Sequence, residues 1–502
     1  MENFLTGSMG IVKLYDALLS VRNQVYKEGQ QQLEHWLPVI KREEFKPSAE
    51  NLAYYLALRR RDLRYLQTQL MALGLSSLGR SESHVLPNLD SIIATLSAIS
   101  GVPSIDTAKW PGFHEFFEGQ QHLQRNATEV FGHGKDHRSI RIMVTLPTEA
   151  ATNHTFIYNL IDKGTECVRI NCAHDNPAIW LRMIENLRAA ERDLGQRCLL
   201  LMDLAGPKVR TKDVIAPKHD NKLTKGSHIL LTYGATHKRF GFDYQTFCSH
   251  PEIVGLLQEG EMVWIDDGHI GTEIEEIRKE GLVLRVTRVR SKGEPLREEK
   301  GLNFPGVNLE LSPLTEKDLT DLDFVAGHAD MVGYSFVQHA EDMAILQLEL
   351  AKRLGEDAKR ISIVAKIETP TAVQNLPEMI VQASGNQPFA VMIARGDLAV
   401  EIGYERLAEI QEEILWVCEA AHVPVIWATQ VLENLVKNAV PSRSEMTDAA
   451  MSERAECVML NKGPYILEGV TTLDKVLTRM QTHQMKKTPQ LRALNMWMDI
   501  EQ

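Results

Sequence analysis

Residues 361 to 368 read Ile361-Ser-Ile-Val-Ala-Lys-Ile-Glu368, an apolar run that ends in a lysine and a glutamate. A second apolar run, Val391-Met-Ile-Ala-Arg-Gly-Asp397, also ends in charged residues. Burying an isolated charge is costly unless a counter-charge, a metal or an ionic ligand compensates it. Because a divalent cation and a phosphate would satisfy all of these charges, the two runs predict an active site.

Short apolar runs rich in β-branched residues alternate with amphipathic, helix-like stretches over most of the chain. Eight such runs separated by helices are typical of an α/β fold of the (β/α)8 TIM barrel type. We therefore predict barrel strands at residues 140–145, 167–171, 199–204, 331–335, 361–368, 389–394, 424–429 and 457–461.

Two further regions have a different pattern. Residues 12–131 repeat leucines and tyrosines at helical spacing, which predicts an N-terminal all-α domain. Residues 212–300, after the third barrel strand, carry alternating strand-like runs and the turn signal Asp266-Asp267-Gly268, which predict an inserted β-barrel cap domain. The expected domains are a helical domain at 1–137, the barrel at 138–211 and 301–485, the cap at 212–300 and a tail at 486–502.

Bulk composition excludes several classes of protein. The chain has 502 residues, 44% of them hydrophobic, and a net charge of -12, which argues against a nucleic-acid or anionic-membrane partner. Its six cysteines form no CxxC pair, so we expect reduced core cysteines in a cytoplasmic protein. No signal peptide or membrane-spanning run is evident.

Polar residues stand at the ends of the predicted strands. Since the carboxyl ends of barrel strands meet at one mouth, these side chains should converge there, although each one alone could be an ordinary solvated or paired residue. They are Arg169, Asn171, Asp203, Ser335, Lys366, Glu368, Asp397 and Thr429.

The motifs around these residues resemble the pyruvate kinase family over roughly residues 141–479. They are Val168-Arg-Ile-Asn-Cys-Ala-His174, Asp203-Leu-Ala-Gly-Pro-Lys-Val-Arg-Thr211, Lys300-Gly-Leu-Asn-Phe-Pro-Gly306, Ala365-Lys-Ile-Glu368, Met392-Ile-Ala-Arg-Gly-Asp-Leu398 and Ala428-Thr-Gln-Val-Leu-Glu433. The resemblance implies a cytoplasmic glycolytic transferase that converts phosphoenolpyruvate and ADP into pyruvate and ATP, in the class with an alcohol-group acceptor, and a homo-oligomer.

The resemblance also implies roles for the catalytic residues. Glu368 and Asp397 would hold Mg²⁺ or Mn²⁺, which suits hard oxygen ligands. Lys366 would stabilise the phosphoryl group in transfer, and Arg169 would bind the substrate phosphate with its planar fork. Thr429 would relay a proton to the enol carbon through water, because its hydroxyl is too weak an acid to act alone.

Substrate and nucleotide contacts follow from the same resemblance. Gly396, at a helix N-terminus, would bind the substrate carboxylate. Ser335 is a further substrate-binding candidate. The nucleotide-binding positions would be Asn171, His174, Arg210 and Lys300.

One departure from the family concerns the monovalent cation that many members bind. Asn171 and Asp203 are retained, but Ala173 and Leu204 replace the serine and threonine ligands. Lys208 stands where potassium-dependent members carry glutamate, so its ammonium could act as an internal substitute for the ion. We therefore expect activity without potassium.

Other departures lie in the loops and at the ends of the chain. Leu460-Asn-Lys-Gly-Pro-Tyr465 replaces the family's Ser-Gly-Glu-Thr run, and for Lys462 within it we favour a solvated turn lysine, with a phosphate contact as the alternative. The family's C-terminal regulatory domain is expected to be absent. For the helical domain we favour packing or oligomerisation.

Two alternatives to the kinase stay open. A catalytically silent sensor or scaffold could bind phosphoenolpyruvate or nucleotide and report through the helical domain. A phosphoenolpyruvate-dependent transferase could keep the enolate chemistry and use another acceptor, because acceptor choice depends on the mouth loops.

Overall fold

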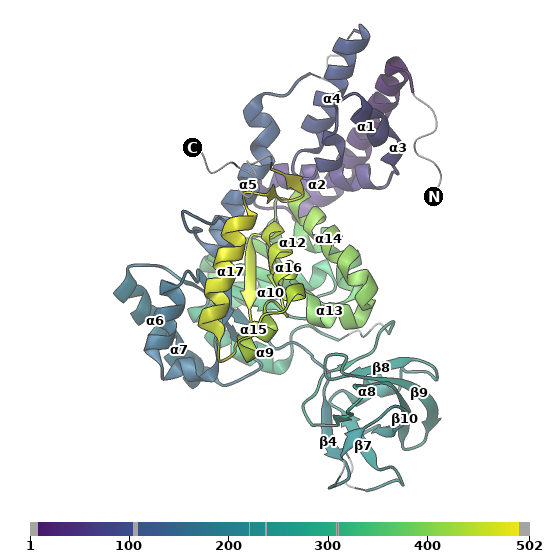
Figure 1. The fold of residues 1–502 in the computed structure, drawn as a ribbon, viewed down its shortest axis with the longest axis vertical. Helices are drawn as coiled ribbons and strands as arrows, with labels where there is room; N and C mark the ends of the chain where they lie inside the picture. The colour runs from purple at the N-terminus through teal and green to yellow at the C-terminus, as the bar shows by residue number, and fades with distance from the viewer. Residues whose placement is uncertain are drawn as a thin grey trace, which may run out of the picture.

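A closed barrel of eight parallel strands forms the centre of the computed structural model, which describes residues 9–103, 109–219, 221–235, 238–307, 309 and 311–490 (Figure 1). Each strand overlaps one predicted run, so the predicted (β/α)8 fold is confirmed. In spatial order the strands are β1 (Arg141–Thr145), β17 (Cys457–Leu460), β16 (Val425–Ala428), β15 (Phe389–Ala394), β14 (Ser362–Ile367), β13 (Met331–Tyr334), β3 (Leu199–Asp203) and β2 (Cys167–Asn171).

Helices surround the barrel and begin at side chains that satisfy their first free amides. Asn153, Asn176, Thr315 and Ser442 each accept a hydrogen bond from the first turn of the following helix. The longer helices are α6 (His154–Asp162), α7 (Pro177–Leu194), α9 (Glu316–His328), α10 (Ala340–Leu354), α12 (Leu376–Ser384), α14 (Tyr404–Ala420), α16 (Arg443–Met451) and α17 (Ile466–Met480). The shorter ones include α11 (Pro370–Gln374), α13 (Arg395–Ile402) and α15 (Glu433–Asn438).

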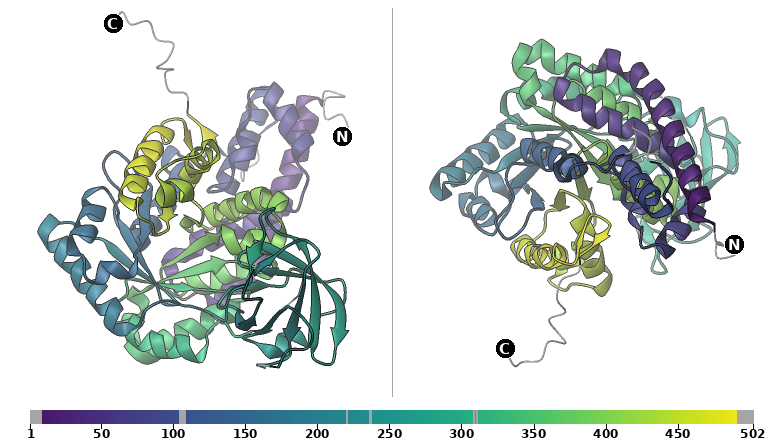
Figure 2. Two further views of the ribbon diagram at one scale, coloured as in Figure 1. Left: turned by 60° about the horizontal axis from the view of Figure 1, so that its bottom comes forward. Right: turned by 90° about the horizontal axis from the view of Figure 1, so that it is seen from above.

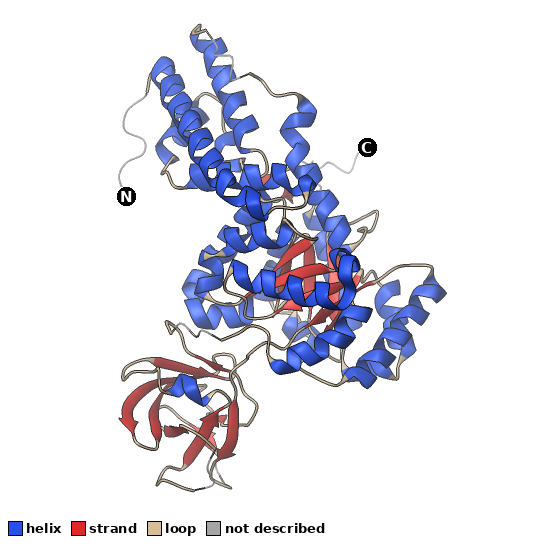
Figure 3. Cartoon of the chain, turned by 180° about the vertical axis from the view of Figure 1, so that it is seen from behind, coloured by secondary structure: helices blue, strands red, loops and turns tan. Residues whose placement is uncertain are grey.

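The N-terminal region is all-α, as predicted, and lies at one end of the barrel (Figures 1 and 3). The last turn of α5 closes that end: Val130 and Phe131 are buried among the inward-facing side chains of the strands, such as Met143 and Leu201. The amino end of the barrel is therefore plugged, and only the opposite mouth is left for a ligand. The helices are α1 (Ile11–Trp36), α2 (Lys46–Arg59), α3 (Arg64–Ala72), α4 (Val85–Ser100) and α5 (Phe113–Phe131).

The segment between β3 and α9 forms a separate β unit beside the barrel (Figures 2 and 3). Its seven-stranded sheet is nearly closed rather than a complete barrel. Irregular register between β9 and β10 accompanies its curvature. In spatial order the strands are β12 (Leu302–Asn303), β8 (Met262–Ile265), β9 (Ile270–Arg278), β10 (Gly281–Arg288), β6 (His228–Thr232), β7 (Tyr244–Cys248) and β4 (Thr211–Ile215), with α8 (Pro251–Val254) and a small pair, β5 (Lys222–Leu223) and β11 (Glu294–Pro295), alongside.

The turn between β8 and β9 follows the sequence prediction. Asp266, Asp267 and Gly268 all have positive φ angles, which short polar residues and glycine tolerate. β12 pairs with β8, so the chain leaves the sheet beside the strand that precedes this turn. The turn therefore lies beside the segment that leads back to the barrel.

Two general expectations can be compared with the structure. All six cysteines are buried and unpaired. Over the described part of the chain, no helix combines the length and apolarity needed to cross a membrane.

A buried histidine joins the helical region to the barrel. His422, between α14 and β16, is 3% exposed; its Nδ1 lies 2.9 Å from Ser48 Oγ and its Nε2 3.0 Å from Ser83 O. Asn126 Nδ2 donates to the His422 carbonyl at 2.7 Å. Burial lowers the pKa of His422 from 6.5 to about 4, so the folded protein holds this imidazole neutral.

This pKa shift predicts a pH dependence of stability. The unfolded chain binds the proton near pH 6.5 and the folded chain only near pH 4, so stability falls as the pH drops through that window. Between pH 7 and 5.5, His422→Gln should lose about 1 kcal/mol less unfolding free energy than wild type. Urea denaturation at both pH values measures this, with the exposed His219→Gln as control; equal losses in all three proteins would contradict the assignment.

Candidate active site

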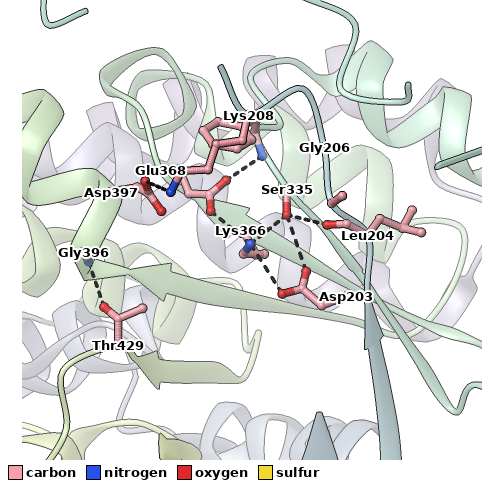
Figure 4. A network of polar contacts seen from close by, with 12 residues as sticks. Asp203, Leu204, Gly206, Lys208, Ser335, Lys366, Glu368, Gly396, Asp397 and Thr429 are labelled. Carbon is pink, nitrogen blue, oxygen red and sulfur yellow. Dashed lines mark hydrogen bonds and ion pairs between the residues drawn. The ribbon is translucent and has the colours of Figure 1, made fainter. Parts of the chain in front are cut away.

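The predicted site residues converge at the open mouth of the barrel. Asp203 and Lys366 come from strands β3 and β14, Glu368 follows β14, Ser335 follows β13 and Asp397 lies in the first turn of α13. Figure 4 shows these side chains pointing toward one another although they come from distant parts of the sequence. The convergence that was expected from the strand ends is therefore present.

Lys366 is the centre of the polar network. Its Nζ donates to Ser335 Oγ at 2.7 Å and lies 3.1 Å from Glu368 Oε1 and 3.5 Å from Asp203 Oδ2. The side chains of Glu368 and Asp203 are only 2% and 1% exposed, so these ion pairs are shielded from water. Burial alone would lower the pKa of Lys366, but Asp203 and Glu368 hold it above its ordinary value, which keeps the ammonium charged.

Arg169, on β2, contacts Asp203, the carboxylate that also lies beside Lys366. Its Nε and Nη2 donate to Asp203 Oδ2 at 2.8 and 2.6 Å, and its Nη1 donates to Thr145 Oγ1 at 3.1 Å. Burial would raise the pKa of Asp203, yet Lys366 and Arg169 lower it below its usual value. One buried carboxylate thus holds two cations at the mouth, where an anionic substrate could bind them.

Glu368 and Asp397 present carboxylate oxygens from neighbouring elements. Glu368 Oε2 accepts the backbone N–H of Phe336 at 2.6 Å, and Phe336 takes a positive φ of 56° there. Burial raises the pKa of Glu368, Asp397 raises it further, and Lys366 opposes the shift. A buried carboxylate, Glu368, and a partly exposed one, Asp397, on neighbouring elements fit a divalent cation that keeps some water or substrate ligands; no cluster of three or more such ligands occurs among the described residues.

Lys208 connects the barrel to the inserted sheet. Its Nζ lies 2.8 Å from Asp397 Oδ1 and 3.3 Å from Asp267 Oδ1, in the turn between β8 and β9. Burial would lower the pKa of Lys208, but Asp397 and Asp267 raise it above its ordinary value. The predicted cation substitute therefore contacts the proposed metal ligand, whereas Arg169 and Lys366 neutralise Asp203.

Gly396 and Thr429 contact each other directly. Gly396 N donates to Thr429 Oγ1 at 2.8 Å, so the amide expected to bind a substrate carboxylate already has a partner. Thr429 has a φ of 66°, the left-handed region that β-branched residues rarely adopt. Arg395 holds this loop, because its guanidinium donates to the carbonyls of Ala428 and Thr429 and pairs with Asp448.

The four predicted nucleotide residues divide into two pairs. Asn171 and His174 line a pocket at the mouth, and burial, followed by Lys462 and Arg210, lowers the pKa of His174. Arg210 lies on the connection to the inserted sheet, where its Nη1 donates to the Glu299 carbonyl at 2.9 Å. Lys300 pairs with Asp266 at 2.9 Å. Arg210 is near enough to His174 to lower its pKa, so the connection to the inserted sheet lies close to this pocket.

Sequence reasoning missed two contributions to the site and did not favour a third. Lys462, for which a solvated turn position was preferred to a phosphate contact, is exposed and also lines the same pocket as Arg169. Asp267 was interpreted only as a turn signal, although its carboxylate reaches Lys208. Asp448, on α16, carries no local motif and was not considered. The turn sequence could have indicated Asp267; the other two contacts depend on which loops the barrel brings together.

Comparisons with known proteins find similar sequences over the barrel and the inserted sheet. A family model described as "Pyruvate kinase, barrel domain" matches residues 137–469. Pyruvate kinase of Candida albicans is 31% identical over 330 residues, 64% of this chain and 63% of the relative. A pyruvate kinase of Agrobacterium vitis is 33% identical over 70% of each chain, and human pyruvate kinase PKLR is 31% identical over 66% of this chain and 58% of the relative. The family match leaves helices α1 to α5 outside it.

The buried Asp203 network predicts a large effect on stability. Asp203→Asn removes the carboxylate that neutralises Arg169 and Lys366, so the free energy of unfolding should fall by about 3 kcal/mol. Asp267→Asn makes the matched control, because the side chain of Asp267 is 60% exposed and its pair with Lys208 should contribute less than about 1 kcal/mol. Urea denaturation compares the two variants, and equal losses would contradict the proposed importance of burial.

Proposed function

The chain belongs to the pyruvate kinase family, and from this premise we propose that it transfers a phosphoryl group between phosphoenolpyruvate and a nucleoside diphosphate. The observation that carries the proposal is the network in which Lys366 meets Asp203, Glu368 and Ser335 beside Arg169. Buried cations held at the mouth of a barrel suit a highly charged phosphate substrate.

Lys366 and Arg169 would act on the migrating group. Phosphoryl transfer has a loose transition state whose charge lies on the phosphate oxygens, so fixed positive charge lowers the barrier. Both side chains are held by Asp203 before the substrate binds, which limits the reorganisation needed during the reaction. Arg169 would orient the phosphate through its coplanar N–H groups. Lys366 would stay in contact with the phosphoryl group as it moves from phosphoenolpyruvate to the acceptor.

Glu368 and Asp397 would hold the divalent ion, Mg²⁺ or Mn²⁺. When bound, this ion would supply positive charge to the phosphate and enolate oxygens. Asp397 is paired with Lys208 in the structure, so Lys208 would have to share or release this carboxylate. The same lysine contacts Asp267 in the turn between β8 and β9, so metal binding would be linked to the position of this turn.

Thr429 would assist the protonation of enolpyruvate. Its Oγ1 accepts the hydrogen bond from Gly396 N, which leaves its own hydroxyl hydrogen to donate to a water molecule. The loop that positions Thr429 is fixed by Arg395, which is 7% exposed. Enolpyruvate would take its proton from this water, because a threonine hydroxyl is too weak an acid on its own.

The reaction class expected from the sequence needs a correction of direction. Transfer to an alcohol group describes the phosphorylation of pyruvate, the direction for which the related kinases are named. In transfer from phosphoenolpyruvate to ADP, the acceptor is a phosphate oxygen of the nucleotide. The proposal concerns this second direction.

A second candidate keeps the enolate chemistry and changes the acceptor. Its support is the pocket beside Arg169, where Lys462 stands with Asn171 and His174, and where Lys437 is paired with Glu433. Lys462 belongs to the loop in which the sequence departs from the family's Ser-Gly-Glu-Thr run. A more basic pocket would favour an acceptor with more negative charge than a nucleoside diphosphate.

The role of Lys366 can be tested by Lys366→Met. Turnover of phosphoenolpyruvate with ADP and Mg²⁺ should fall about 10³-fold or more, because the variant loses charge that stabilises the transition state. Glu368→Gln should instead weaken Mn²⁺ binding, measured by electron paramagnetic resonance, while Lys366→Met retains it. An unchanged rate in a folded Lys366→Met protein would remove Lys366 from the mechanism.

We further propose that Lys208 makes potassium unnecessary. Pyruvate formation should proceed at equal rates with potassium and with tetramethylammonium at the same ionic strength, because the ammonium supplies a fixed charge near the metal ligand. Lys208→Gln should lower the rate with both cations. If activity is lost in tetramethylammonium and restored by potassium, the proposal is wrong.

A further inference from the structure

A second polar pocket lies in the N-terminal helical region, outside the part of the chain that matches the family. It is bounded by the end of α2, the start of α3, the 3-10 turn Ser77–Arg80 and the hairpin of β18 (Gln484–Met485) and β19 (Thr488–Pro489). Its cavity volume is about 360 Å³, within the usual range for small-molecule sites. Its polar lining includes Tyr55, Arg59, Arg64, Gln67, Glu82 and Lys487.

The pocket carries an excess of positive charge. Four of its lining residues are cationic and only two are acidic, although the whole chain has a net charge of -12. Three of the cations are ion-paired: Arg64 with Asp62, Lys487 with the buried Glu82, and Arg61 with Glu28 outside the lining, which leaves Arg59 as the source of the excess charge. Such a local reversal of charge favours an anionic ligand.

Arg59 is the cation that a ligand could use most directly. Its Nη1 donates to Tyr55 Oη at 2.8 Å, and its guanidinium lies 4.7 Å from the centre of the Trp416 ring. Among the described residues, no carboxylate pairs with Arg59. Stacking fixes the guanidinium plane and leaves further N–H donors at its edge, the geometry that suits a phosphate group.

Two neighbours complete the polar wall. Lys487 Nζ also lies over the Trp416 ring, at 4.8 Å from its centre, so Arg59 and Lys487 share one aromatic platform. The side-chain amide of Gln67 packs against Gly79, where an added Cβ would lie 2.5 Å from Gln67 Nε2. Glycine at this position therefore gives the amide room beside the pocket.

We propose that this pocket binds a small molecule carrying a phosphate group, with Arg59 and Lys487 as its main contacts. The volume exceeds what a free phosphate ion needs, which favours a phosphate monoester. The site would join two parts of the protein, because Arg59 belongs to α2 whereas Trp416 belongs to α14 and Lys487 follows the last barrel helix. Ligand binding would thus stabilise the attachment of the helical region to the barrel.

The test compares two adjacent arginines. Arg59→Gln removes a pocket cation, whereas Arg60→Gln makes the same change on a side chain that is 59% exposed and directed to Glu28. Melting temperatures of the full chain are measured against inorganic phosphate and against glycerol phosphate, with chloride at matched ionic strength. Wild type and Arg60→Gln should show a saturable rise in melting temperature, and Arg59→Gln should need at least about tenfold more ligand, since one Arg–phosphate contact contributes on the order of a tenfold affinity. Arg59→Lys should lie between them.

The outcomes separate this pocket from the mouth of the barrel. Phosphate bound only at Arg169 and Lys366 would stabilise both glutamine variants equally, and that result would overturn the proposal. No saturable rise in wild type would also overturn it. Tighter binding of glycerol phosphate would identify the ligand as a monoester, and equal binding would identify free phosphate. Loss of kinase activity in the full chain would not affect this test.

Discussion

The active site depends on one constraint: nearby carboxylates must balance the positive charge of the buried Lys366 ammonium. A lysine side chain only 12% exposed stays charged because Asp203 and Glu368, each almost completely buried, surround it. Asp203 in turn requires Arg169, and Glu368 requires the Phe336 amide. Removing any member leaves a charge in a low-dielectric environment, where its cost is several kcal/mol. The strands therefore have to meet in one register for the site to exist at all.

The two additions to the barrel act at opposite ends. Helix α5 fills the amino end with Val130 and Phe131, so the inward-facing layer of methionines, cysteines and aliphatic residues is continuous with the helical region. The inserted sheet stands by the carboxyl end, where Lys208 reaches both Asp397 and Asp267. The proposed reaction therefore has only the open mouth of the barrel as its site, which leaves the helical region for a separate function.

The boundary between the helical region and the barrel has specific polar contacts beside the apolar core that the two parts share. His422, Ser48 and Asn126 form hydrogen bonds across it, and the C-terminal hairpin places Lys486 beside Glu456 and Lys487 beside Glu82. Polar groups that are buried at such a boundary have to find specific partners, so they define one docking geometry rather than a sliding apolar contact. A ligand bound next to Lys487 would add to the same set of contacts.

The sequence by itself determined the barrel, the order of its strands along the chain and the set of charged residues at their ends. These features are local: apolar runs of strand length, helix-capping residues and turn signals such as Asp266-Asp267-Gly268 depend on neighbours in the chain. It also indicated which residues should share the mouth, because all parallel strands of a barrel end on one side. Only the tertiary structure decided that Lys208 pairs with Asp397 rather than with Asp203, that Lys462 lines the pocket beside Arg169, and that Arg59 meets Trp416 and Lys487. Residues that are far apart in the sequence make these contacts, and loop packing, which no local pattern encodes, brings them together.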